Sequence, residues 1–216
     1  MGSVFGSTAG YEAPPFQLLM ASSAVEADQG SCPEASFFEV RRYQPAIIAY
    51  TEYTAAEGTS GAVRRIAGFI FGDNAQKTSV AMTVPVATTQ QQIGDSVGAY
   101  VTSEPLSTTT TAAATTTTTA MQRMVFFMPS QYSLETLPRP NDGRVVVTTL
   151  PERTMAVLRY SGNGESQFAE KATALFTALA ANTRVTSVSK AEAVLLQYNP
   201  PWTLPCATYQ RSYGAH

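Results

Sequence analysis

Hydrophobic and polar positions along the 216-residue chain follow two periods, which predict an alternation of strands and helices. Apolar and polar side chains alternate over residues 37–42, and residues 46–53 are rich in β-branched and aromatic side chains, so both stretches predict strands. The period changes over residues 58–72, where a helix is expected. Its apolar residues at helical spacing are Val63, Ile66, Ala67 and Ile70.

The same order of elements returns in the second part of the chain. Residues 144–150, 154–160 and 193–198 predict strands, and residues 166–181 predict a helix. The apolar stripe of this helix is Phe168, Ala172, Leu175, Phe176 and Leu179. Because each stripe must be buried against a sheet face, the pattern predicts an α+β fold of two similar halves. We expect about eight antiparallel strands in a curved sheet or distorted β-barrel, together with two helices.

Three further stretches complete the predicted sheet, namely residues 16–20 as an outer strand, residues 77–87 and residues 121–128. Pro85 has no backbone N–H to donate, so it is expected at a sheet edge or a bulge.

The first helix has expected ends and one unusual residue. Thr59 or Ser60 is expected to cap its start, and Gly72 is expected to end it. Gly68 inside the helix costs about 1 kcal/mol relative to alanine. It therefore implies either close packing of the helix on the sheet or room for a flat ligand.

Composition divides the chain into an N-terminal arm and loop over residues 1–36 and a single domain over residues 37–213. Within that domain, residues 90–120 include a Thr/Ala-rich run without large apolar side chains. Such a run buries too little apolar surface to offset its ordering entropy, so it predicts a flexible insertion in a hairpin.

Charge and cysteine content exclude several classes of function. The net charge is -2 and no block of Lys or Arg occurs, which argues against nucleic acid as a partner. No apolar run reaches the roughly 20 residues of a membrane span. The two cysteines are far apart and form no CxxC motif, so no metal site is expected. No Lys or Arg precedes Arg41, which argues against a signal or transit peptide and favours a cytoplasmic protein.

A rigid corner near the C-terminus holds the chain's only tryptophan. It reads Tyr-Asn-Pro-Pro-Trp-Thr-Leu-Pro over residues 198–205. Proline fixes its own φ and pushes the preceding residue toward extended geometry, so the corner aims Trp202 in a definite direction. Trp202 then either plugs the end of a core or lines a cavity.

Four stretches carry a resemblance to a known family. They are Phe-Glu-Val-Arg-Arg-Tyr-Gln-Pro at residues 38–45, Ala-Met-Thr-Val-Pro-Val at 81–86, Val-Phe-Phe-Met-Pro at 125–129 with Arg139-Pro140, and the corner at 198–205. In this order and spacing the chain resembles the SOUL haem-binding proteins, most closely the plant cytosolic type. The resemblance implies a distorted barrel of two βαββ halves. It also implies reversible binding of haem or a related tetrapyrrole in an apolar groove beside the first helix.

The resemblance assigns candidate roles to seven residues. Val63, Ile66 and Ala67 would form one wall of the groove, and Trp202 and Leu204 the other. Arg64 and Arg65 would hold the anionic propionates, although two adjacent arginines are also typical of a solvated helix face.

Departures from the family shape the expected chemistry. Arg42 stands where one haem-ligating member has a histidine, and an arginine has no lone pair for iron. The only histidine is His216, the last residue; Met82 and Cys206 are the other axial candidates.

We therefore expect a non-enzymatic tetrapyrrole carrier or buffer with weak or no axial ligation and no catalytic residues. The alternative is a structural or interaction protein that kept the fold and lost the ligand, and a protein partner stays open in both cases. An enzyme is disfavoured because the chain has no internal histidine to serve as a base.

Overall fold

The computed structural model describes residues 10–22, 38–89, 121–160, 164–182, 193–198 and 211–214. The predicted insertion at residues 90–120 lies outside these ranges, and so does the corner beyond Tyr198.

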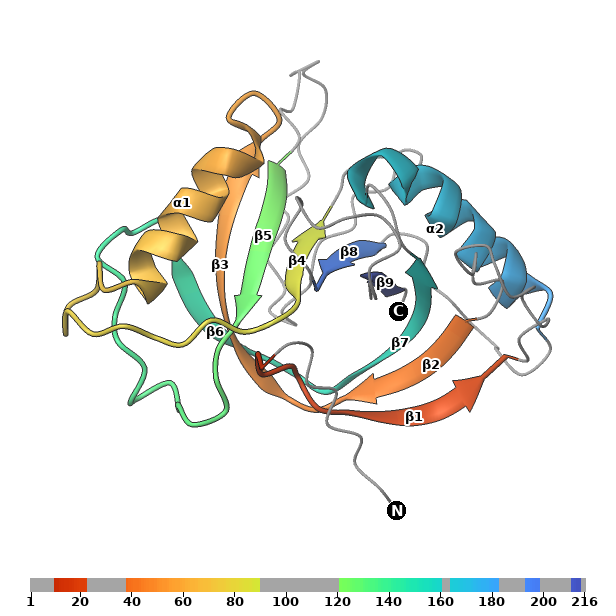
Figure 1. Ribbon diagram of the computed structural model, residues 1–216, viewed down its shortest axis with the longest axis horizontal. Helices are drawn as coiled ribbons and strands as arrows, with labels where there is room; N and C mark the ends of the chain where they lie inside the picture. The colour runs from red at the N-terminus through yellow and green to blue at the C-terminus, as the bar shows by residue number, and fades with distance from the viewer. Residues whose placement is uncertain are drawn as a thin grey trace, which may run out of the picture.

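Strands and helices alternate as the hydrophobic pattern predicts, and the α+β class is confirmed (Figure 1). The elements are β1 (Phe16–Ala21), β2 (Phe38–Tyr43), β3 (Ala46–Thr54), α1 (Gly58–Ile70), β4 (Val86–Thr89), β5 (Met121–Phe127), β6 (Val146–Leu150), β7 (Arg153–Tyr160), α2 (Gly164–Ala180), β8 (Val194–Gln197) and β9 (Arg211–Gly214).

Every pairing between these strands is antiparallel, and the strands follow each other in the order β1-β2-β7-β9-β8-β4-β5-β3-β6. The described strands therefore form a curved run with two ends, β1 and β6 (Figure 1). The predicted outer strand is confirmed, since β1 pairs only with β2 among the described strands. Apart from β1, the strand order is symmetric. If β2, β3, β4 and β5 exchange places with β6, β7, β8 and β9, respectively, the order read from one end becomes the order read from the other end.

The two helices cover different parts of the sheet (Figure 1). The predicted stripe of α2 is confirmed, because all five of its residues are buried in one cluster with Phe38 of β2, Leu158 of β7 and Leu195 of β8. The predicted stripe of α1 is right only in part. Ile66 and Ile70 are buried against β3 and β5, but the helix fills the rest of this contact with Ala62 and Phe69. Val63 is displaced to the surface and is 40% exposed.

The strand predicted over residues 77–87 is wrong in its first part. The chain is irregular from Lys77 to Pro85, and β4 begins only at Val86. The reason lies in the backbone hydrogen bonds: the N–H of Val80 donates to the carbonyl of Ile70 at 2.7 Å, and the N–H of Val84 to that of Glu12 at 2.9 Å. These donors tie the segment to the end of α1 and to the N-terminal segment instead of to a neighbouring strand.

The predicted capping residues of α1 are wrong, whereas its predicted first residue, Gly58, and its predicted end are confirmed. Glu57 occupies the cap position and makes no side-chain capping bond, and Thr59 and Ser60 lie inside the helix. Gly72 follows the helix with a φ of 113°, a conformation that glycine adopts without steric cost. Neither helix in the described ranges is both long and apolar enough to span a membrane.

Candidate functional site

One face of α1 exposes an apolar row. Val63 and Ala67 are four residues apart on the helix, and Phe71 continues the row because its N–H still donates to the carbonyl of Ala67 at 2.9 Å. Val63 is 40% exposed, Phe71 is 70% exposed, and Ala67 between them is half-buried. A helix of a globular protein normally turns such residues inward, so this outward row is a candidate contact surface.

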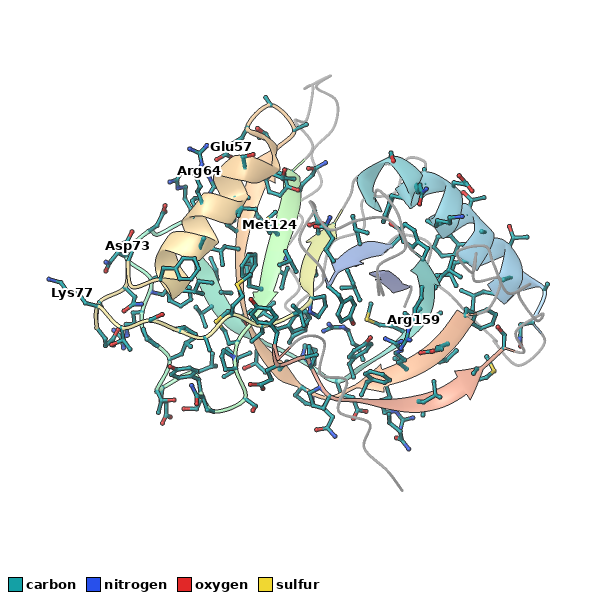
Figure 2. The ribbon with its side chains drawn as sticks, in the orientation of Figure 1. Glu57, Arg64, Asp73, Lys77, Met124 and Arg159 are labelled. Carbon is teal, nitrogen blue, oxygen red and sulfur yellow. The ribbon has the colours of Figure 1, made fainter. Side chains whose placement is uncertain are left out.

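Arg64 lies beside this row and points into solvent (Figure 2). The Nε of Arg64 donates to the carbonyl of Ser60 at 3.2 Å, one turn earlier on the same helix. Among the described residues the terminal nitrogens of Arg64 make no hydrogen bond or ion pair, and the side chain is exposed. Arg64 is therefore placed to meet an anionic group that reaches the exposed row of Val63, Ala67 and Phe71.

Arg65 is placed differently, although it is the next residue. Its Nε donates to Thr51 Oγ1 at 3.0 Å, and one terminal nitrogen donates to the carbonyl of Glu52, also at 3.0 Å. The other terminal nitrogen pairs with Glu57, and the hydrogen bond from Arg65 lowers the pKa of that carboxyl group. The Arg65 side chain is only 8% exposed. The Arg65 side chain therefore links α1 to β3 through hydrogen bonds, whereas the Arg64 side chain bonds only within its own helix among the described residues.

Two other residues of α1 bear on the predicted groove. Ile66 is fully buried, so it supports the helix from beneath and has no surface of its own to offer. A Cβ added to Gly68 would meet only the side chain of Asp73, at 3.9 Å. Gly68 is therefore not required by close packing of the helix on the sheet, which was one of its two expected roles.

The other predicted residues separate into two groups. Trp202, Leu204, Cys206 and His216 lie outside the described residues. Met82 is half-buried against the core beneath α1. Arg42 is exposed on β2, where its Nε lies 3.9 Å from a carboxylate oxygen of Glu152. In the described part of the chain, no group of three or more His, Cys, Asp or Glu side chains is placed to hold a metal ion.

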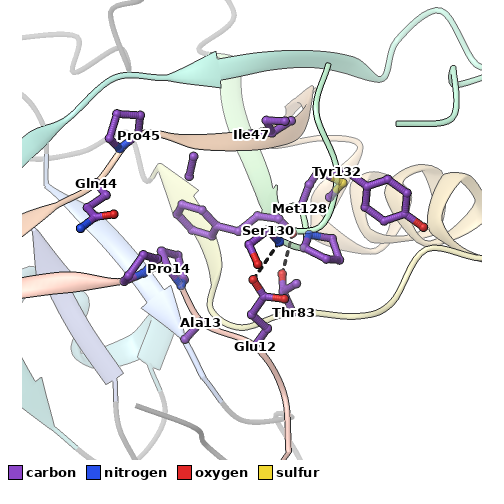
Figure 3. Close-up of a pocket in the computed structure, with 14 residues that line it drawn as sticks. Glu12, Ala13, Pro14, Gln44, Pro45, Ile47, Thr83, Met128, Ser130 and Tyr132 are labelled. Carbon is purple, nitrogen blue, oxygen red and sulfur yellow. Dashed lines mark hydrogen bonds between the residues drawn. The ribbon is translucent and has the colours of Figure 1, made fainter. Parts of the chain in front are cut away.

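A separate pocket of about 240 Å³ lies under the N-terminal segment (Figure 3) and was not predicted from the sequence. Residues 12–15, the turn at residues 44–47 and the segment after β5 enclose it. The Glu12 carboxylate accepts a hydrogen bond from the N–H of Ser130 at 2.8 Å, and the Thr83 hydroxyl donates to the carbonyl of Phe127 at 2.5 Å. Each of the three enclosing segments contains proline, which stiffens the backbone. These prolines are the sequence feature that could have indicated the pocket.

The size of this pocket decides its relevance to a tetrapyrrole. Sites for drug-sized ligands measure about 300 to 1,000 Å³, and a tetrapyrrole is a large ligand. The pocket is smaller than that range, and the Glu12 and Thr83 groups described above already hold its walls together. The exposed face of α1 is therefore the better candidate for a flat ligand.

Comparison with solved structures supports the fold at low sequence identity. A chain of an EcmrR–DNA complex matches with a TM-score of 0.51 and 8% identity, covering 82% of this chain and 55% of that one. An uncharacterized conserved protein from Listeria innocua matches with a TM-score of 0.51 and 10% identity, covering 82% of this chain and 90% of that one. This chain thus spans only about half the length of the first of these structures. At such identities the likeness concerns the fold alone.

Comparison of the sequence with known families gives a more specific result. No curated protein matches the chain. The family described as SOUL heme-binding protein matches residues 9–209, which is most of the chain and includes α1 with its exposed row. The chain therefore belongs to the SOUL heme-binding protein family.

Proposed function

We propose that this protein binds haem or a related tetrapyrrole reversibly at the exposed face of α1 and acts as a carrier or buffer without catalysis. The observation that carries the proposal is the apolar row beside Arg64, in which Val63 and Phe71 are exposed and Ala67 is half-buried. Family membership supplies the class of ligand. A tetrapyrrole has broad apolar faces and anionic propionates, which suit an apolar row flanked by a guanidinium group.

The proposal divides the candidate residues into those that contact the ligand and those that support the helix. In the proposal Val63 and Ala67 contact one face of the ligand, Phe71 extends this wall, and Arg64 pairs with a propionate. Ile66 and Arg65 act from beneath, because their side chains hold the helix on the sheet. Trp202 and Leu204 remain the proposed opposite wall, on the strength of the family resemblance.

The proposed mode of binding depends little on iron. Arg42 offers no lone pair, and the single histidine of the sequence is its last residue. The ligand would then be held by its faces and propionates, with weak or no axial ligation. Haemin and metal-free protoporphyrin should therefore bind with similar affinity.

We further infer that the sheet is a distorted barrel of two βαββ halves, β3-α1-β4-β5 and β7-α2-β8-β9. The symmetric strand order supports this inference. A single domain over residues 37–213 and a cytoplasmic location complete the proposal.

Absorbance titration of the full chain with haemin and with protoporphyrin tests the proposed function. We expect both to saturate at micromolar concentrations. Val63→Asp should weaken both by at least about tenfold, since a carboxylate would replace apolar contact and repel the propionates. Leu134→Asp is the matched control, because Leu134 is 51% exposed and lies outside α1.

Two results would contradict the proposal. No Soret change at micromolar haemin would favour a structural or interaction protein that kept the fold without the ligand. A haemin affinity orders of magnitude above that for protoporphyrin, with a six-coordinate low-spin spectrum, would refute binding without strong ligation.

A further inference from the structure

The inner face of β2 and β7, opposite the face that α2 covers, carries a cluster of charges. Side chains alternate along β2, so Phe38 and Val40 pack toward α2 while Glu39, Arg41 and Tyr43 point the other way. Arg159 of β7 shares this inner face, and Figure 2 shows it beside β7 on the side away from α2. The arrangement places two guanidinium groups around one carboxylate.

Arg41 lies at the base of this cluster, and its side chain is only 2% exposed. Its Nε donates to Glu39 Oε2 at 2.6 Å, a terminal nitrogen donates to the Tyr43 hydroxyl at 3.2 Å, and its charge lies 4.3 Å above the ring of Phe16. The other terminal nitrogen lies 2.5 Å from Glu39 Oε2 but makes no hydrogen bond in the described part of the chain. A buried arginine thus keeps unfilled donors.

Arg159, which lies nearer to the surface, also has a buried nitrogen without a hydrogen bond in the described part of the chain. Its Nε is buried and makes no hydrogen bond to the described residues, and it lies 3.8 Å from Glu39 Oε1. The Arg159 side chain as a whole is 32% exposed, whereas that of Glu39 is 13% exposed. Solvent therefore reaches the cluster from the side of Arg159, with Arg41 at the closed end.

In the described part of the chain, the charges that pair within the cluster do not balance. Glu39 is the one carboxylate that pairs with either arginine among the described residues, and it serves both. Excess buried charge and unfilled donors are costly unless an ion or another partner compensates for them.

We propose that this inner face binds a compact oxyanion, a carboxylate or a phosphate group, through the unfilled donors of Arg41 and Arg159. The planar guanidinium group suits both anions because it presents parallel N–H donors to two oxygens. The site lies on β2 and β7 and is distinct from the face of α1. Phosphate as a free ion and a carboxylate of an organic ligand are the two sources that share this chemistry.

Titration of the full-length protein at constant ionic strength tests the site, with the NMR signals of the arginine Nε–H groups as the readout. The probes are inorganic phosphate, benzoate and benzamide, the last being the neutral counterpart of benzoate. We expect saturable shifts of the Arg41 and Arg159 signals with at least one oxyanion, and binding of benzamide about tenfold weaker or absent. Saturation by phosphate or by benzoate identifies the source, and either result supports the proposal.

Two variants sharpen this test. Arg159→Gln should weaken oxyanion binding by about tenfold, because it removes a charged donor from the accessible side. Lys77→Gln, at an exposed residue after α1 that belongs to neither proposed site, should leave it unchanged. No saturable binding of either oxyanion, or equal binding of benzoate and benzamide, would overturn the proposal and leave the cluster a link between β2 and β7. If Arg159→Gln failed to fold, the site-specific signals of the unmodified protein would still decide the question.

Discussion

The two helices of this protein occupy corresponding places in the element order but expose different surfaces. All five apolar stripe residues of α2 are buried, and no large apolar side chain of α2 with a described position is exposed. At α1, by contrast, Val63 on the helix and Phe71 directly after it are exposed, although the helix has a full core contact of its own. Similar elements in similar order thus carry one structural and one candidate binding helix, which shows why fold alone does not assign function.

The inner surfaces of the sheet differ in the same way. Behind β3 and β5 the inner cluster is apolar and includes Ile48, Val125 and Phe127. Behind β2 and β7 the apolar cluster is small, and Glu39, Arg41 and Arg159 lie beside it. The α1 side therefore places its candidate chemistry outside the sheet, and the α2 side places it inside.

The largest expected difference between the two helices concerns the free energy of unfolding. Leu175→Ala should lower the free energy of unfolding by about 2 to 5 kcal/mol, because it opens a cavity under α2. Val63→Ala should change it by less than about 0.5 kcal/mol, since the side chain is already exposed. Urea denaturation of both variants measures the difference. Equal losses would contradict the assignment of Val63 to a free surface.

The adjacent arginines of α1 provide the next test. Arg65→Ala should destabilise the protein by about 1 to 3 kcal/mol, because Thr51 and the carbonyl of Glu52 lose their donor. Arg64→Ala should leave the free energy of unfolding within about 0.5 kcal/mol.

For ligand binding the order should be reversed, with Arg64 more important than Arg65. Arg64→Ala should weaken haemin binding severalfold, since its charge is free to meet a propionate. Arg65→Met, measured below its unfolding temperature, should bind nearly as well as the unmodified chain. Absorbance titration of the variants checks this, and a stronger loss in the Arg65 variant would reverse the proposed roles.

The smallest expected effect concerns acid stability at Asp142, which precedes β6. The side-chain hydrogen bond from Arg144 lowers the pKa of Asp142 from 3.8 to about 2. A lowered pKa contributes stability that is present above the unfolded value and is lost as the pH falls through the folded value. Asp142→Asn should therefore be slightly less stable than the unmodified chain at pH 6, and the gap should shrink between pH 4 and pH 2. Denaturant midpoints across this range would show it, and a gap that widened with acid would contradict the assignment.

Much of the fold could be predicted because the signals are local. Alternation over β2 and β3, and the helical stripe of α2, follow from the requirement that apolar side chains share one face. The errors occurred where tertiary contacts replace local partners. The backbone of residues 77–85 bonds to α1 and to Glu12 instead of joining a strand, and no local pattern encodes those distant acceptors.

The candidate site shows the same division. The sequence by itself determined that α1 would carry an apolar stripe with two arginines, and the family motifs indicated a tetrapyrrole. Only the tertiary structure decided that Ala62 and Phe69 fill the core contact, which leaves Val63 outside, and that Arg65 bonds to β3 while Arg64 does not. The physical reason is that helical periodicity specifies a face to within about one residue, whereas the rotation of the helix on the sheet depends on the side chains it meets there.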